Sequence, residues 1–202
     1  MPSPQSLTLQ ASDPDPMLEF RVFGTDLEAA RDILRREVPV PTREERTDVY
    51  FLGGAATRSF KLRDQCALDL KELVGHDGDW ERWAPRGRCP LPADGEVIIA
   101  TFPLAELPTL RPGAEYGPGM ISVAFEQEGY RRVTVRKARE IYEAGEMRAE
   151  FARVEADGLP ETMTLALEGP SVARLEEWRN RLGLSDRENM SYPTMLGRAG
   201  LT

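Results

Sequence analysis

Charged and hydroxyl side chains alternate with apolar ones in several short segments of this chain. Residues two positions apart on a β-strand project from the same face, so each segment would present its polar side chains together. An antiparallel sheet with one solvated face gives the same pattern, with ion pairs between neighbouring strands, so alternation alone does not define a site. The polar residues of these segments are Glu19 and Arg21, Lys61 and Arg63, Asp69 and Lys71, and Thr164 and Glu168.

These residue types would bind a polyphosphate and a divalent metal ion if their faces converged. Arginine binds phosphate oxygens with two parallel hydrogen bonds, and lysine acts as a mobile point charge. Mg²⁺ and Mn²⁺ prefer carboxylate oxygens as ligands. A metal ion beside a phosphoryl group neutralises charge and orients water.

The length and composition fit one globular domain. The chain has 202 residues, of which 41% are hydrophobic and 30% are charged, and these are globular values. The net charge of -8 argues against sequence-independent nucleic-acid binding, which needs a basic surface. No apolar segment approaches the roughly 20 residues that span a bilayer, so we expect no membrane insertion.

The two ends of the chain and its cysteines suggest a simple organisation. Residues 1–16 are rich in Pro, Ser and Asp and lack the features of a secretory signal, so we expect a flexible tail before a single domain at residues 17–202. Cys66 and Cys89 are isolated and lack metal-ligand spacing. They are typical of reduced thiols in a cytoplasmic protein.

The hydrophobic pattern predicts an α+β protein that is mainly antiparallel β. The strands are short and show no βαβ rhythm, which argues against a doubly wound sheet. Closure into a barrel removes the exposed edges of so many strands. We therefore predict a closed barrel of about eight strands with helices outside. The expected strands are Leu18–Val22, Asp48–Leu52, Ser59–Arg63, Ala67–Val74, Ile121–Glu126, Arg131–Arg139, Met147–Val154 and Met163–Glu168.

Turn and capping residues set the expected boundaries. Gly129 and the two residues before it predict a hairpin that joins the strands at 121–126 and 131–139. Thr25 with Glu28 forms a capping-box pattern before a helix expected at residues 26–37. Ser171 is expected to cap a last amphipathic helix.

The order of the charged motifs resembles that of the CYTH domain, the triphosphate tunnel metalloenzyme family. The resemblance extends from Met17 to about Leu201, and each motif alone is weak. Two acids of the family pattern are absent, at Met17 and Ala166. The matching segments are Met17–Arg21 for E-x-E-x-K, Asp48–Tyr50 for D-x-Y, Lys61–Arg63 for R-x-R, Leu68–Lys71 for L-x-L-K, Lys137–Arg139 with Tyr142 for K-x-R and tyrosine, and Ala166–Glu168 for E-x-E.

The resemblance implies a tunnel in which basic residues bind a triphosphate. Glu19 and Glu168 would hold one Mg²⁺ or Mn²⁺ ion, and the missing acids argue against a second ion; Glu150, Glu126 or Asp69 could substitute. Lys71 would have a lowered pKa next to Arg63 and act as a base, and Tyr50 would hydrogen-bond a tunnel group. The implied substrate-binding residues are Arg21, Lys61, Arg63, Lys71, Lys137 and Arg139.

Residues 131–139 leave two interpretations of which face lines the tunnel. Lys137 and Arg139 share a face with Val133 and Val135. If that apolar face packs outward under a helix, Arg132 and Arg136 line the tunnel instead. We rank the motif pair first and keep Arg132 as a candidate.

Four functions remain open at this point. The first is a phosphohydrolase acting on inorganic, nucleoside or thiamine triphosphate. The second is a binder of triphosphate or another polyanion that has lost catalysis, which the missing acids favour. The third is adenylate cyclase chemistry, which the family also supports, and the fourth is an unrelated barrel with a solvated face.

Overall fold

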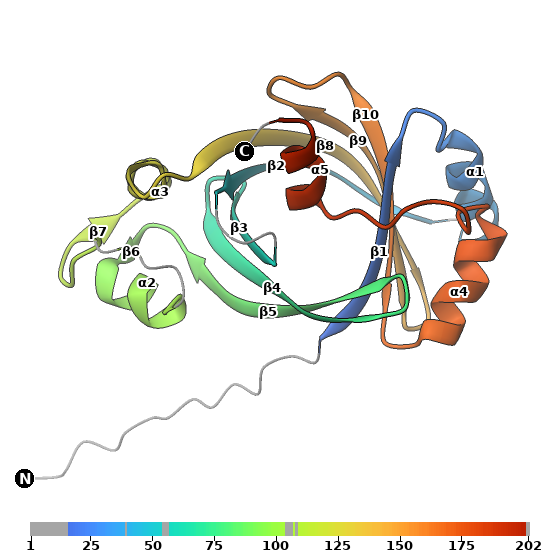
Figure 1. Cartoon of the computed structure of the whole chain (residues 1–202), viewed down its shortest axis with the longest axis horizontal. Coiled ribbons are helices and arrows are strands. Elements are labelled where there is room, and N and C mark those ends of the chain that lie inside the picture. Colours follow the sequence, from blue (N-terminus) through green and yellow to red (C-terminus); the bar gives the residue numbers. More distant parts are fainter. Residues whose placement is uncertain (1–15, 39, 54–56, 104–106, 108, 201–202) are drawn as a thin grey trace, which may run out of the picture.

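A closed antiparallel β-barrel of eight strands forms the centre of the molecule (Figure 1). The computed structural model describes residues 16–38, 40–53, 57–103, 107 and 109–200. The barrel strands follow the order β1-β10-β9-β8-β2-β3-β4-β5, and β5 pairs with β1 to close it. The α+β barrel fold with about eight strands is thus confirmed. The elements are β1 (Met17–Gly24), α1 (Glu28–Glu37), β2 (Thr42–Leu52), β3 (Arg58–Arg63), β4 (Ala67–Asp77), β5 (Trp80–Pro90), β6 (Ala93–Asp94), α2 (Gly95–Thr101), β7 (Glu115–Tyr116), α3 (Pro118–Gln127), β8 (Arg131–Ala144), β9 (Met147–Ala156), β10 (Thr162–Gly169), α4 (Val172–Arg181) and α5 (Tyr192–Arg198).

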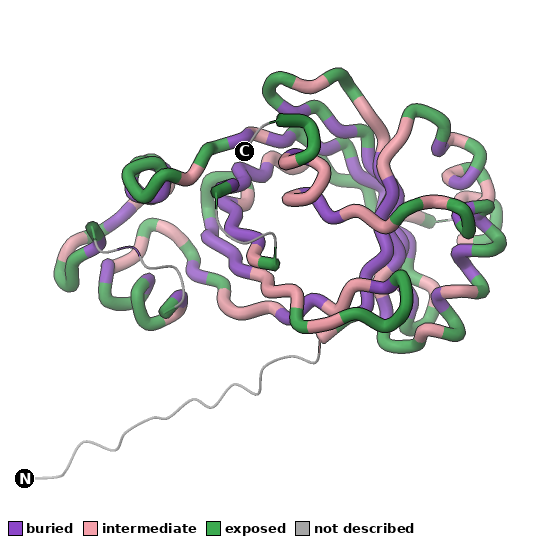
Figure 2. Tube along the Cα trace, in the orientation of Figure 1, coloured by how far each residue is buried: buried purple, intermediate pink, exposed green. Residues whose placement is uncertain are grey.

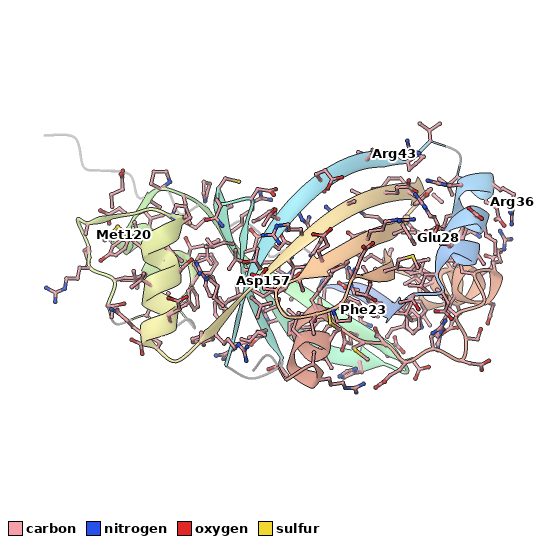
Figure 3. All side chains as sticks on the ribbon, turned by 90° about the horizontal axis from the view of Figure 1, so that it is seen from above. Phe23, Glu28, Arg36, Arg43, Met120 and Asp157 are labelled. Atoms are coloured by element: carbon pink, nitrogen blue, oxygen red, sulfur yellow. The ribbon has the colours of Figure 1, made fainter. Side chains whose placement is uncertain are left out.

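Helices cover the outer face of the barrel on two sides. In Figure 1, α1 and α4 lie on one side, and α2 and α3 lie on the other with the small β6-β7 sheet. Met120 on α3 and Arg36 on α1 mark the two ends of the molecule (Figure 3). None of the described helices is long and apolar enough to cross a lipid bilayer.

On β1, β3 and β4, the apolar residues face these helices, and the polar ones face the barrel interior. Phe20 and Val22 of β1 belong to a buried cluster with Leu34 of α1 and Trp178 of α4. A second buried cluster joins the other side of the barrel to α2 and α3. In this cluster, Phe125 of α3 stacks on Phe51 of β2. Many of the buried residues therefore lie along the barrel strands (Figure 2). Since the apolar faces are used outside, the polar partners of each alternation point inward.

The helix α5 lies at one opening of the barrel (Figure 1). Its Tyr192 and Leu196 form a third buried cluster with inward-facing residues of β8, including Val133 and Val135. Phe23, at the end of β1, packs edge-to-face on Tyr192 at 5.1 Å. The apolar face of residues 131–139 therefore faces the barrel interior under α5, and Lys137 and Arg139 share that interior face.

Two local predictions were wrong. Residues 121–126 belong to the helix α3, so the expected hairpin with residues 131–139 does not form. Pro118 occupies the first turn, where its missing N–H costs nothing, and Gly129 has a positive φ of 82° just after the helix. The helix expected at 26–37 begins at Glu28, and its N-cap makes no side-chain hydrogen bond, so the capping box at Thr25 is absent.

The N-terminus of α4 lies where it was predicted. Ser171 is the N-cap of α4, and its hydroxyl accepts a hydrogen bond from the backbone N–H of Arg174. β9 and β10, the strands expected at residues 147–154 and 163–168, pair antiparallel. The expected N-terminal tail lies outside the described residues, apart from Pro16.

Candidate functional site: a cationic cavity inside the barrel

One cavity of about 170 Å³ lies inside the barrel, and charged side chains dominate its wall. Eight of the described lining residues are cationic and three are carboxylates, although the whole chain has a net charge of -8. The cavity therefore concentrates positive charge in a protein that is acidic overall. The cationic residues are Arg21, Arg46, Lys61, Arg63, Lys71, Lys137, Arg139 and Arg148, and the carboxylates are Glu19, Glu150 and Glu168.

Two carboxylates face each other where β1 pairs with β10. Glu19 lies directly opposite Glu168 in the register, so both side chains project into the cavity. Arg21 Nε donates to Glu19 Oε1 at 3.0 Å, and Arg21 Nη2 lies 3.8 Å from Glu168 Oε1. Lys71 Nζ lies 3.5 Å from the other oxygen of Glu19. This end of the cavity thus holds a mixed cluster of acids and bases.

The charges of this cluster fix its protonation. Burial raises the pKa of Glu19, but the charges of Lys71 and Arg21 lower it by more than burial raises it, so the pKa is about 2. The pKa of Lys71 is raised, because the attraction of Glu19 exceeds the effect of burial. The prediction that the pKa of Lys71 is lowered was wrong in direction, because the attraction of Glu19 outweighs burial and the repulsion of Arg21. Lys71 therefore keeps its proton and serves as a cation.

A buried ion pair lies deeper, near α5. Lys137 Nζ donates to Asp48 Oδ2 at 2.6 Å and to Tyr50 Oη at 3.0 Å. Its ammonium group also sits 3.8 Å from the ring centroid of Tyr192. Burial raises the pKa of Asp48, but the surrounding cations, Lys137 first, lower it to about 2. Burial and the charge of Asp48 raise the pKa of Tyr50 well above its usual value, so its phenol stays protonated.

Arg139 of β8 links the two strands that flank it in the barrel. Its guanidinium forms ion pairs with Glu44 of β2 and Glu150 of β9. Glu150 lies opposite Ala166 in the β9-β10 register, and Arg21 Nη1 donates to it at 3.3 Å. A carboxylate therefore stands beside the position where the family motif has lost one, because Ala166 leaves room for a side chain from the neighbouring strand.

Lys61 differs from the other cavity lysines. No hydrogen bond or ion pair joins it to any other described residue, although the side chain faces the cavity. Burial is the main cause that lowers the pKa of Lys61, to about 8. The charge of Asp48 raises this pKa, whereas the charges of Lys71, Arg46 and Arg63 lower it. Arg63 itself pairs with Asp69 at 2.6 Å. Lys61 is therefore a buried amine without a direct ion pair, and its favourable neighbours are the charge of Asp48 and the ring of Tyr50, whose centroid lies 5.7 Å from Nζ.

The structure brings together every predicted site residue except Arg132. Its side chain is 53% exposed and lies 3.3 Å from Glu126 of α3, outside the barrel. Arg136 is also exposed and pairs with Asp157. Arg132 is therefore corrected to an outer-surface residue, because even-numbered residues of β8 point away from the cavity. The predicted residues that meet in the cavity are Glu19, Arg21, Tyr50, Lys61, Arg63, Lys71, Lys137, Arg139 and Glu168.

Two cationic residues of the cavity were missed. Arg46 lies two positions before Asp48 and donates to its Oδ2 at 3.0 Å. Arg148 lies two positions before Glu150 and 3.6 Å from Glu168 Oε2. Extending the strand expected at residues 48–52 by one alternation toward the N-terminus reaches Arg46, whereas Arg148 already lies in the strand expected at 147–154, on the same face as Glu150.

The donor set fits a metal ion that shares its coordination with a ligand. The described residues contain no group of three or more His, Cys, Asp or Glu side chains placed to hold a metal. Glu19 and Glu168 supply a facing pair of carboxylates. Mg²⁺ commonly binds through one or two carboxylates, with phosphates and waters completing the octahedron. Of the three candidate substitutes, Glu150 and Asp69 face the interior, whereas Glu126 lies outside.

The fold and the site define a class, namely closed antiparallel barrels with a cationic internal cavity. No family model and no curated protein matches the sequence. Solved structures share the fold at low sequence identity. The PH1012 protein from Pyrococcus horikoshii OT3 is 17% identical, with 88% of this chain and 94% of that chain covered and a TM-score of 0.52.

Two further solved structures carry descriptions of activity. A candidate adenylate cyclase from Bacillus halodurans is 12% identical, with 92% of this chain and 98% of that chain covered and a TM-score of 0.52. HpAC1 from Hippeastrum, described as having a dominant triphosphatase activity, is 13% identical, with 92% and 97% covered and a TM-score of 0.51. The resemblance to CYTH proteins is thus confirmed at the level of the fold.

Proposed function

We propose that this protein is a phosphohydrolase that acts on a triphosphate-containing compound inside its barrel. The observation that carries the proposal is the cavity wall, where eight cationic side chains converge in a chain of net charge -8. A triphosphate carries several negative charges in a short chain, so it is the kind of ligand that this wall would balance. The triphosphatase activity described for HpAC1, which shares the fold, supports the same reaction class.

The arginines and lysines of the cavity would bind the phosphate oxygens. In the structure, Arg21 and Arg139 already make charge-assisted hydrogen bonds to carboxylates. A bound triphosphate would exchange some of these partners for phosphate oxygens, which arginine binds in the same planar geometry. Lys61 needs no exchange, because it has no ion-pair partner among the described residues.

The facing carboxylates would hold the metal ion. Glu19 and Glu168 would bind one Mg²⁺ or Mn²⁺ together with phosphate oxygens. When bound, such an ion neutralises charge on the reacting phosphoryl group and orients water. The low pKa of Glu19 keeps that carboxylate ionised across the physiological pH range.

Lys71 and Tyr50 would contribute to ligand binding and would not act as general bases. Lys71 keeps its proton because of Glu19, so it would donate to a phosphate oxygen as a cation. The hydroxyl of Tyr50 accepts a hydrogen bond from Lys137 and would hold that ammonium group in place.

Binding without hydrolysis is the second candidate. The positions of two family acids hold Met17 and Ala166, and the cavity carboxylates are all ion-paired with basic residues. A cavity of this kind would keep its affinity for a polyanion even if it bound a metal too weakly for catalysis.

Phosphate release distinguishes the two candidates. Inorganic triphosphate, ATP and thiamine triphosphate would each be incubated with Mg²⁺, Mn²⁺ or EDTA, using wild type, Glu168→Ala and, as the matched control, Glu126→Ala on the outer face. Hydrolysis predicts metal-dependent release that only Glu168→Ala abolishes. Metal-independent binding without release would establish the binder. Formation of cyclic AMP and pyrophosphate from ATP would contradict both candidates and indicate a cyclase.

A further inference from the structure

The chain contains only three lysines, and all three line the cavity. They are Lys61, Lys71 and Lys137, and every other cationic side chain of the Lys and Arg type is arginine. Arginine binds phosphate with better geometry than lysine and stays charged at any accessible pH. Phosphate binding alone therefore does not explain why these positions carry amines. An amine can also lose its proton and act as a nucleophile.

The three amines are in different states. Lys71 is ion-paired with Glu19 at 3.5 Å, and Lys137 is held by Asp48 at 2.6 Å. Lys61 has no hydrogen bond or ion pair to any described residue. It is 9% exposed and faces the cavity. Burial lowers the pKa of Lys137 as well, to about 7, but its nitrogen already donates to Asp48 and Tyr50. Among the described lysines, Lys61 is thus the one whose nitrogen faces the cavity without a hydrogen-bond or ion-pair partner.

The surroundings of Lys61 lower its pKa in the free protein and also attract an anionic ligand. Burial and the charges of Lys71, Arg46 and Arg63 lower its pKa to about 8, so a large fraction is neutral at mildly alkaline pH. Arg63 projects from the same face two residues along β3, about 7 Å away along the strand. A phosphate bound at Arg63 would place a short side arm next to the Lys61 nitrogen.

We propose that Lys61 forms an imine with a phosphorylated aldehyde whose phosphate group is bound by the neighbouring Arg63 and Lys71. The Nζ lone pair attacks the carbonyl carbon, and the carbonyl π electrons move to the oxygen, which takes up a proton. The carbinolamine then loses water as the C=N bond forms. One amine and one aldehyde give one imine and one water, so no oxidant or reductant is required. The proposal rests on the phosphate-binding part of the proposed function and not on hydrolysis.

Borohydride trapping tests this site directly. The wild-type protein would be incubated at pH 8 with pyridoxal 5′-phosphate or with the smaller glycolaldehyde phosphate, reduced with borohydride and mapped by mass spectrometry. We expect a single adduct on Lys61 that is lost in Lys61→Arg and kept in Arg132→Ala, whose side chain lies outside the barrel. Pyridoxal without the phosphate should label about tenfold less, since one charge-assisted contact is worth about 1.5–3 kcal/mol. Inorganic triphosphate should protect Lys61.

Several results would overturn the proposal. They are equal labelling by pyridoxal, labelling of Lys71, Lys137 or the terminal amine in place of Lys61, and no adduct with either phosphorylated aldehyde. The outcome is separate from that of the hydrolysis assay. Labelling with triphosphate protection but no phosphate release would leave the imine site standing and remove the hydrolase. Phosphate release without any adduct would do the reverse.

Discussion

Replacing Lys61 with methionine should stabilise the folded protein at neutral pH, although Lys61 belongs to the proposed binding site. The side chain is buried and has no ion-pair partner among the described residues, so the charge of Asp48 offsets only part of the cost of burying its ammonium group. Its pKa falls from 10.5 to about 8 on folding, chiefly because of burial. At about 1.4 kcal/mol per pH unit, the charged form costs about 3 kcal/mol of folding free energy below pH 8. Methionine has a similar length and would remove this cost.

The effect should depend on pH in a defined direction. Between pH 8 and 10.5 the unfolded state binds more protons at Lys61 than the folded state does, so wild-type stability rises with pH across that window. The advantage of Lys61→Met should therefore be full below pH 8 and disappear above pH 10.5. Lys71→Met is the matched control. It should lower stability, because Lys71 has a raised pKa and compensates Glu19.

Urea unfolding at pH 7 and pH 10.5 would measure these differences, and calorimetry with inorganic triphosphate would measure the accompanying loss of binding. The reasoning is refuted if Lys61→Met is less stable than wild type at pH 7. It is also refuted if the gain is the same at both pH values, because the gain would then come from added apolar packing.

Three other perturbations follow from the cavity charges. Binding of triphosphate at pH 8 should take up about half a proton at Lys61, because Lys61 is then half protonated and the anion raises its pKa. Lys137 can add to the total, because its pKa is about 7. Calorimetry in two buffers of different ionisation enthalpy, on wild type and Lys61→Met, measures the share of Lys61, and equal uptake by both proteins would contradict the assignment. Asp48→Asn should destabilise the fold by about 3 kcal/mol, since it leaves Lys137 buried without its counter-charge, and urea unfolding with a loss under about 1 kcal/mol would count against the pair. Glu19, with a pKa of about 2 against 4.5 unfolded, stabilises the fold above pH 4.5 and loses that contribution as pH falls toward 2; acid titrations of wild type and Lys71→Met should differ in this window, and identical curves would refute the coupling.

Alternation along the strands was enough to predict the barrel and the inward faces of β1, β3 and β4. Each of these strands reads polar and apolar with a period of two, so only one assignment of faces buries the apolar side. The start of β2 carries charges at consecutive positions, from Arg43 to Arg46. Alternation is absent there, which is why Arg46 was missed.

The remaining failures depend on contacts that are distant in sequence. The apolar segment in α3 is short, so its sequence is compatible with either a strand or a helix. Packing of one helical face against the outer face of the barrel stabilises the helix. The inward face of β8 is set by α5, whose Tyr192 packs on Val133. The pKa of Lys71 follows from Glu19, which approaches from a non-neighbouring strand. Local sequence reasoning sees Arg63 beside Lys71 and predicts the opposite direction.

The most direct test of the central claim is calorimetric binding of inorganic triphosphate in EDTA to wild type, Arg63→Ala and Arg132→Ala. Arg63 lines the cavity, whereas Arg132 lies outside the barrel. The cavity model predicts binding that weakens about tenfold or more in Arg63→Ala, because a charge-assisted contact is lost, and that is unchanged in Arg132→Ala. Absence of binding to the wild type, or an equal loss in both variants, would contradict a triphosphate site inside the barrel.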